Sequence, residues 1–116
     1  SAINNDNVDA IGHPTGRLLL KRDPYEINLG KIYEAAEEND VALEINSFPS
    51  RLDLPDIEIK KAKQYDIKFS LGTDSHNREH LRFMEFGIAN ARRGWLGEND
   101  VLNTMNLGEI EDYLGL

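Results

Sequence analysis

Apolar and polar residues alternate in three short stretches of the chain, and this alternation predicts β-strands. The stretches are residues 8–11, 41–45 and 67–71. In the last, Ile67, Phe69 and Leu71 alternate with Lys68 and Ser70, which is typical of a strand with one buried face.

Apolar residues at three- and four-residue steps predict helices between and after these strands. The predicted helices cover residues 28–40, 55–65, 77–93, 99–105 and 108–114. Asn77 or the preceding Ser75 can begin the third. Gly87 lowers its helix propensity by about 1 kcal/mol, which suggests close packing or a kink. Gly94 would end this helix. Its two last arginines and Trp95 could touch nucleic acid, but we expect a cation pair at the helix end beside a packed Trp95. Strands that alternate with crossover helices predict an α/β fold with a parallel sheet, and 116 residues allow one domain.

Candidate ligands follow the strands at the points where the strands end. His13 follows the first strand, and Asp74 and His76 follow the third. The carboxyl ends of parallel strands meet at one edge of a sheet, so these side chains can converge as nitrogen and oxygen ligands of a divalent metal. Two of them also have ordinary explanations: Asp74 could cap the next helix, and His76 could lie on the surface. Glu44 could reach the site or pair with an Arg or Lys. Because a catalytic metal usually has three protein ligands and an open position, the residues alone predict half of a metal site.

Composition narrows the chemistry. The chain has no cysteine, which excludes disulfides and thiolate metal sites. Its net charge of −8, from 21 acidic and 13 basic residues, argues against broad electrostatic adhesion to nucleic acid. Bound metal cations could still make the electrostatic potential positive within the site, so that a phosphodiester could bind there. No apolar run approaches the ~20 residues that span a bilayer, and we expect a cytoplasmic location. The chain lacks an initiator Met, and we expect it to be a piece of a longer protein.

Four segments together resemble a known family. They are IGHPTGRLLLKRDPY, LEINSFPSRLDL, GTDSHN and MEFGIANARRGWL. They are similar to the C-terminal part of the PHP (polymerase and histidinol phosphatase) domain, in the version attached to family X DNA polymerases of bacteria and archaea. The resemblance implies that residues 1–116 form a single partial domain, the C-terminal portion of a distorted (β/α)7 barrel. Three parallel strands would alternate with helices and lead to a helical C-terminus.

The resemblance also implies a function. Members of the family are divalent-metal-dependent phosphoesterases that hold up to three Zn²⁺ or Mn²⁺ ions, and the polymerase-linked form is a 3′–5′ exonuclease or processes DNA ends. His13, Asp74 and His76 would be metal ligands here. Glu44 matches a family position that supports the site without binding metal directly.

Two arginines lie in segments that resemble substrate-facing loops. Arg17 and Arg51 would bind phosphate oxygens, for which the guanidinium fork is suited. The family's first HxH motif, a further His and a bridging Glu are absent, and the remaining histidine, His80, matches no ligand. We therefore expect the N-terminal half of the barrel as a partner, an exposed strand edge in the isolated chain, and little activity without that half.

Alternatives remain open at this point. The parent could be another PHP phosphatase, of the histidinol-phosphatase kind, or an amidohydrolase-like metallohydrolase that acts on a substrate without phosphate. The chain could also be a non-catalytic fragment with a structural or interaction role.

Overall fold

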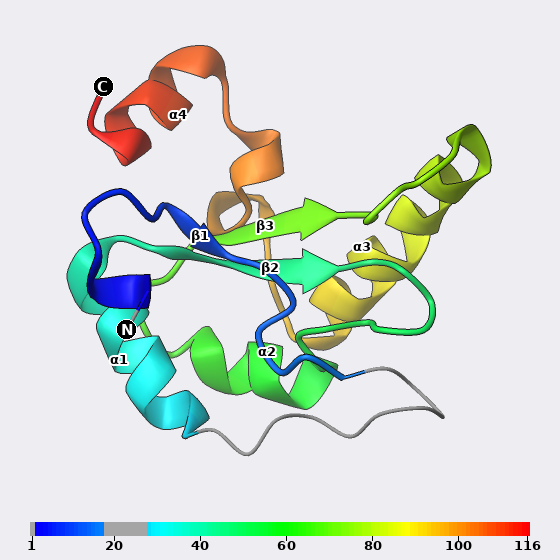
Figure 1. Cartoon of the computed structure of the whole chain (residues 1–116), viewed down its shortest axis with the longest axis horizontal. Coiled ribbons are helices and arrows are strands. Elements are labelled where there is room, and N and C mark those ends of the chain that lie inside the picture. Colours follow the sequence, from blue (N-terminus) through cyan, green and yellow to red (C-terminus); the bar gives the residue numbers. More distant parts are fainter. Residues whose placement is uncertain (1, 18–27) are drawn as a thin grey trace.

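Three parallel strands form the centre of the molecule. The computed structural model describes residues 2–17 and 28–116. Its strands are β1 (Ala10–Ile11), β2 (Ala42–Asn46) and β3 (Phe69–Gly72), in the order β1-β2-β3 (Figure 1). All neighbouring strands are parallel, which confirms the predicted α/β class. The sheet is open, as a portion of a barrel would be.

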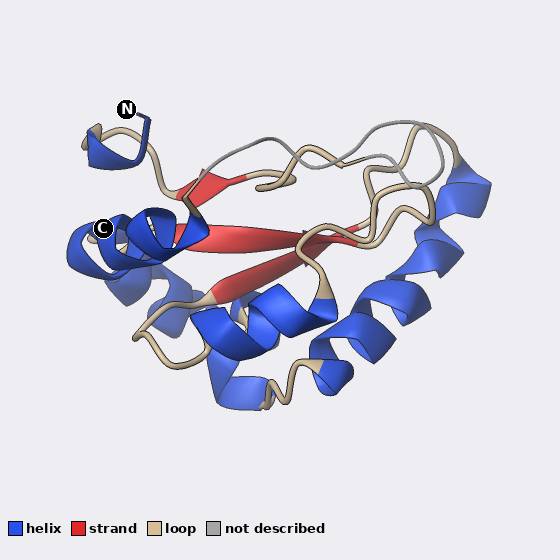
Figure 2. Cartoon of the chain, turned by 90° about the horizontal axis from the view of Figure 1, so that it is seen from below, coloured by secondary structure: helices blue, strands red, loops and turns tan. Residues whose placement is uncertain are grey.

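Helices follow the strands in the predicted order. They are α1 (Leu29–Asn39), α2 (Asp56–Ala62), α3 (Met84–Arg93) and α4 (Leu107–Leu114). Short 3₁₀ helices cover Ala2–Asn4, Arg78–Phe83, Glu98–Asp100 and Leu102–Thr104. In the view of Figure 2, α1, α2 and α3 lie on the same side of the sheet. Among the described residues, no helix has the length and apolar composition needed to cross a membrane.

One face of the sheet makes the hydrophobic core. Leu43, Ile45 and Phe69 are fully buried and pack with apolar residues of the three covering helices. Because side chains alternate along a strand, Glu44 and its register partner Ser70 lie on the opposite face. The two faces of the sheet therefore differ: one packs against the helices in the hydrophobic core, and the other has polar side chains near the strand ends.

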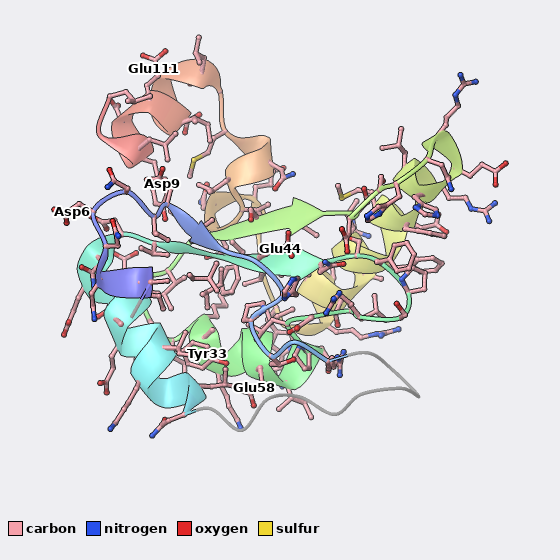
Figure 3. The ribbon with its side chains drawn as sticks, viewed as in Figure 1. Asp6, Asp9, Tyr33, Glu44, Glu58 and Glu111 are labelled. Carbon is pink, nitrogen blue, oxygen red and sulfur yellow. The ribbon has the colours of Figure 1, made fainter. Side chains whose placement is uncertain are left out.

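Helices α1 and α2 are joined by a tyrosine. The Tyr33 hydroxyl donates to Glu58 Oε1 at 2.7 Å (Figure 3), and burial, together with Glu58, raises the pKa of Tyr33. The Tyr65 ring lies 5.5 Å from the Tyr33 ring, centroid to centroid. The prediction that α2 continues to Tyr65 is wrong: the helix ends at Ala62, and a turn then carries Tyr65 onto α1.

The predicted helix from residue 77 to 93 consists of two kinds of helix. Asn77 begins it, as one of the two proposed start residues, and its side-chain oxygen accepts the N–H groups of Glu79 and His80. Residues Arg78–Phe83 are 3₁₀, and the α-helix begins only at Met84. The reason is local, because an Asn side chain that binds N–H groups two and three residues onward favours a tight first turn.

The expectation that Trp95 packs into the fold is wrong. Its side chain is 66% exposed, and Lys60 Nζ lies 3.7 Å from the ring centroid. Gly94 contacts α2 instead, so closely that a Cβ there would lie 2.3 Å from Ile59 Cγ2. Gly94, at the end of α3, thus takes the position against α2, and the indole of the next residue lies outside.

The outer edge of β3 is covered. Val101 forms a parallel bridge to Phe69. The Asn103 side chain accepts the Leu71 N–H at 2.8 Å and donates to the Leu71 carbonyl at 3.0 Å. The helix predicted for residues 99–105 is therefore two 3₁₀ turns, since Val101 between them is extended and pairs with the strand. In the described part of the chain, β1 forms the other edge of the sheet.

Candidate functional site

The Glu44 carboxylate lies between the ends of the two neighbouring strands. Its Oε1 accepts the His13 N–H at 2.9 Å and the Asn46 side-chain N–H at 3.3 Å. A Cβ on Gly12 would lie 3.7 Å from Oε1, and one on Gly72 only 3.2 Å from Oε2. Figure 3 shows Glu44 on β2, at the middle of the sheet. Among residues 2–17 and 28–116, the partners of Glu44 are this backbone amide and a neighbouring amide side chain, and a pairing with Arg or Lys elsewhere in the barrel stays a prediction.

Two predicted ligands have an unusual backbone conformation. His13 has φ 28° and Asp74 has φ 52°, and each lies two residues beyond the end of its strand. A positive φ is uncommon for residues other than glycine, and it persists where the surrounding structure enforces it, often at functional sites. At His13 the constraint is visible, since Glu44 binds its N–H and Gly16 donates to its carbonyl at 2.9 Å.

His76 has one ring nitrogen engaged. Its Nδ1 lies 2.7 Å from the Asp74 carbonyl oxygen. A carbonyl oxygen can only accept, so Nδ1 carries the proton and the lone pair is on Nε2. Metal-binding histidines in proteins are held in this way, with one ring N–H on a carbonyl or carboxylate and the other nitrogen toward the metal.

The loop after β2 folds back onto the strand that it leaves. Asn46 and Asp53 pair as an antiparallel bridge. The Asp53 carboxylate is fully buried and accepts the Thr15 N–H through both oxygens, at 3.1 and 3.0 Å. Sequence reasoning missed this residue. Its only sequence signal is a carboxylate between two leucines, in Leu52-Asp53-Leu54.

The two predicted phosphate-binding arginines differ in their surroundings. Arg17 donates from Nε to the Arg51 carbonyl at 2.7 Å and from Nη2 to the Leu52 carbonyl. Burial lowers the pKa of Arg17, and the nearby carboxylates of Asp53 and Asp56 oppose that shift. Arg17 thus braces the loop after β2.

Arg51 lies next to a predicted metal ligand. Its Nη1 donates to the Arg17 carbonyl at 3.3 Å, and its Nε lies 3.9 Å from Asp74 Oδ2. The Arg51 side chain is only 16% exposed. A guanidinium held at this position can neutralise a carboxylate or bind an oxyanion beside it.

The predicted ligands approach one another only in part. Within residues 2–17 and 28–116, no group of three or more His, Asp or Glu side chains could hold a metal ion. Asp74 and His76 share one loop, and His13 lies at the end of β1, two strands away across the sheet. The donor types suit Zn²⁺ or Mn²⁺, whereas their number is below that of a catalytic centre.

Known proteins similar to this chain have names of two kinds. The chain is homologous to the DNA polymerase/3′–5′ exonuclease PolX of Bacillus subtilis, with 40% identity over 114 residues. It is 32% identical over 120 residues to a probable phosphatase of Thermoanaerobacter sp. (strain X514). Each match covers 98% of this chain, but only 20% and 46% of the respective relative. A probable phosphatase of Caldicellulosiruptor saccharolyticus is 34% identical over 82 residues, or 66% of this chain. No protein-family model matches.

Proposed function

We propose that this chain is part of a divalent-metal-dependent phosphoesterase of the PHP type and supplies one portion of its metal-binding edge. The observation that carries the proposal is the Asp74–His76 loop at the end of a parallel strand, in which His76 Nδ1 faces the Asp74 carbonyl and Nε2 has no partner among the described residues. The homologues named as an exonuclease and as phosphatases support hydrolysis of phosphoesters.

The residues would divide the task as follows. His76, through Nε2, would hold metal together with Asp74 and His13, and with ligands from another part of the parent protein. Bound Zn²⁺ or Mn²⁺ would supply a water of lowered pKa and positive charge beside the phosphoryl oxygens. Arg51 would bind a phosphate oxygen next to Asp74, and Arg17 would keep the Arg51 loop in place. We assign no general base to this chain.

Of the possible reactions we favour the processing of DNA 3′ ends. The relative named as a polymerase and 3′–5′ exonuclease shares more sequence identity with this chain than the probable phosphatases do. The partners would then be DNA and the N-terminal half of the barrel. Hydrolysis of a small phosphoester is the second candidate, and the probable phosphatases support it.

A substrate panel on the full-length parent tests both candidates. Single-stranded DNA, a nitrophenyl phosphate, a nitrophenyl phosphodiester and an amide would each be incubated with Mn²⁺. We expect turnover of DNA and of the phosphodiester, and we expect Asp74→Asn to lose it while Asp112→Asn on α4 does not. Turnover of the amide alone would contradict the proposal and favour an amidohydrolase-like enzyme.

Metal binding to the isolated chain is a separate question. The chain would be titrated with Zn²⁺ and Mn²⁺ while the His13 and His76 NMR signals are followed. We expect little or no change in either signal, because fewer than three ligands converge in the described part of the chain, and clear perturbation of both would show that the chain binds metal by itself. Unchanged signals at millimolar metal would favour a structural or interaction role for the chain by itself.

A further inference from the structure

A second histidine, His80, contacts the Asp74–His76 loop from the following 3₁₀ helix. Its Nδ1 accepts the backbone N–H of His76 at 3.1 Å. Two phenylalanines hold its ring. Phe83 is stacked on it, with centroids 5.4 Å apart and planes at 24°, and Phe48 meets it edge-on at 5.0 Å and 80°. The imidazole is therefore held by a hydrogen bond at Nδ1, by one stacked ring and by one ring that meets it edge-on.

We propose that His80 is a positioning residue, which holds His76 in the conformation that leaves Nε2 free for a ligand. The importance of this geometry for catalysis rests on the proposed function, whereas the geometry itself does not. Without the bond from His80, the His76 backbone could rotate, and the contact of its Nδ1–H with the Asp74 carbonyl would be lost with it.

The two histidines must carry their protons on opposite ring nitrogens. His76 donates from Nδ1 to a carbonyl, so its neutral ring is the Nδ1–H tautomer. His80 accepts at Nδ1 from a backbone amide, so its neutral ring is the Nε2–H tautomer. A proton on His80 Nδ1 would face the His76 amide proton across a 3.1 Å gap between the nitrogens.

One contact competes with this assignment. The Asn77 side-chain nitrogen lies 3.2 Å from His80 Nε2, and the Asn77 oxygen already accepts two backbone N–H groups. A neutral imidazole has a single acceptor nitrogen, so only one of the two contacts is a hydrogen bond. We assign the bond to Nδ1, because the His76 amide is fixed by the backbone and its contact of 3.1 Å is the shorter of the two.

Phe48 extends the support to the neighbouring strand. It belongs to the loop after β2, and it contacts both His80 and Phe83, the latter at 5.4 Å and 86°. The Arg51–Asp74 ion pair joins the same two loops a second time. His80 therefore couples the loop after β3 to the loop after β2 as well as to His76.

Nitrogen NMR on the metal-free chain tests the proposal without reference to metal or activity. The pH should lie well above the ordinary histidine pKa of about 6.5. We expect ¹⁵N shifts of an Nδ1–H tautomer for His76 and an Nε2–H tautomer for His80. We also expect a scalar coupling across the hydrogen bond between the His76 amide nitrogen and His80 Nδ1. A proton on His80 Nδ1, or the absence of that coupling, would overturn the proposal.

Two substitutions separate the hydrogen bond from the ring packing. His80→Phe keeps an aromatic ring against Phe48 and Phe83 but removes the acceptor, and His80→Asn restores an acceptor near the Nδ1 position. We expect His80→Phe to speed hydrogen exchange of the His76 amide, and His80→Asn to return it toward the wild-type rate. Equal exchange in wild type and His80→Phe, with the fold intact by circular dichroism, would contradict a positioning role.

A metal titration of the full-length parent then links this geometry to the proposed function. Loss of a partner that orients a metal-binding histidine typically lowers metal affinity by about 10- to 100-fold, and we expect His80→Phe to fall in that range. If the parent binds no metal although the opposed tautomers are observed, the proposed function fails and the positioning of His76 by His80 stands.

Discussion

Substitution of Gly87 by alanine should destabilise the protein although it improves helix propensity. Gly87 lies within α3 and faces the end of β2. A Cβ there would lie 1.8 Å from Ser47 Oγ, 2.9 Å from Ser47 Cβ and 2.9 Å from Leu71 Cδ2. Ser47 is fully buried, so neither its side chain nor the helix can move without disturbing the core.

The magnitude follows from two opposing contributions. Alanine in a helix interior is favoured over glycine by about 1 kcal/mol. Inserting a methyl group into a well-packed core costs about 1–3 kcal/mol, and three contacts below 3.0 Å place Gly87 near the upper end. We therefore expect Gly87→Ala to lower the free energy of unfolding by about 1–2 kcal/mol.

Urea unfolding followed by circular dichroism measures this change. Gly108→Ala is the matched control, because a Cβ on Gly108 in α4 would lie 3.5 Å from its nearest neighbour, Asn106 Oδ1. That variant should be as stable as wild type or more stable, by up to about 1 kcal/mol. Adding Ser47→Gly to Gly87→Ala removes both contacts with Ser47 and should recover part of the loss.

Two results would refute this reasoning. The first is a Gly87→Ala protein as stable as the Gly108→Ala control. The second is a double variant whose loss equals the sum of the losses caused by Ser47→Gly and Gly87→Ala alone, since residues in contact should not behave additively.

Three further changes test other parts of the structure. Gly72→Ala would place a Cβ 3.2 Å from Glu44 Oε2 and should loosen the bond to the His13 N–H; unchanged hydrogen exchange at His13 would contradict this. Asn103→Ala removes both hydrogen bonds to the edge of β3 and should cost about 1–3 kcal/mol in urea unfolding, whereas an unchanged midpoint would show that water replaces the side chain. Burial raises the pKa of Tyr113 to about 12. The stability that the buried, protonated hydroxyl contributes is therefore fully present below the ordinary tyrosine pKa of 10.0 and is lost as the pH rises through about 12. Tyr113→Phe should therefore lose less stability than wild type between these pH values, and parallel losses would contradict the assignment.

Where the sequence predicted the structure well, the signal was local. Alternation located all three strands to within two residues, and Asn28 and Asn77 were recognised as candidate first residues of helices. The side chain of Asn28 accepts the Lys31 N–H at 3.3 Å, which is the capping geometry expected of it. Such features depend on residues within a few positions of one another, and a single sequence contains them.

Two of the errors arose where a distant contact decides the conformation. Trp95 was expected to pack, but the approach of Gly94 to Ile59 leaves the indole exposed. Asp53 was missed because its partner is the Thr15 N–H, 38 residues away in sequence. The exposure of Trp95 and the burial of Asp53 both depend on how two distant segments pack together, which no local sequence pattern predicts.

Each predicted metal ligand is held by a residue that is not itself a predicted ligand. Glu44 binds the His13 N–H, Arg51 lies beside Asp74, and His80 binds the His76 N–H. All three contacts join residues of the described chain. Loops that are already ordered before metal binds lose less conformational entropy when the metal and the remaining ligands bind. We therefore expect the parent protein to gain affinity chiefly from additional ligands, and little from reordering of these loops.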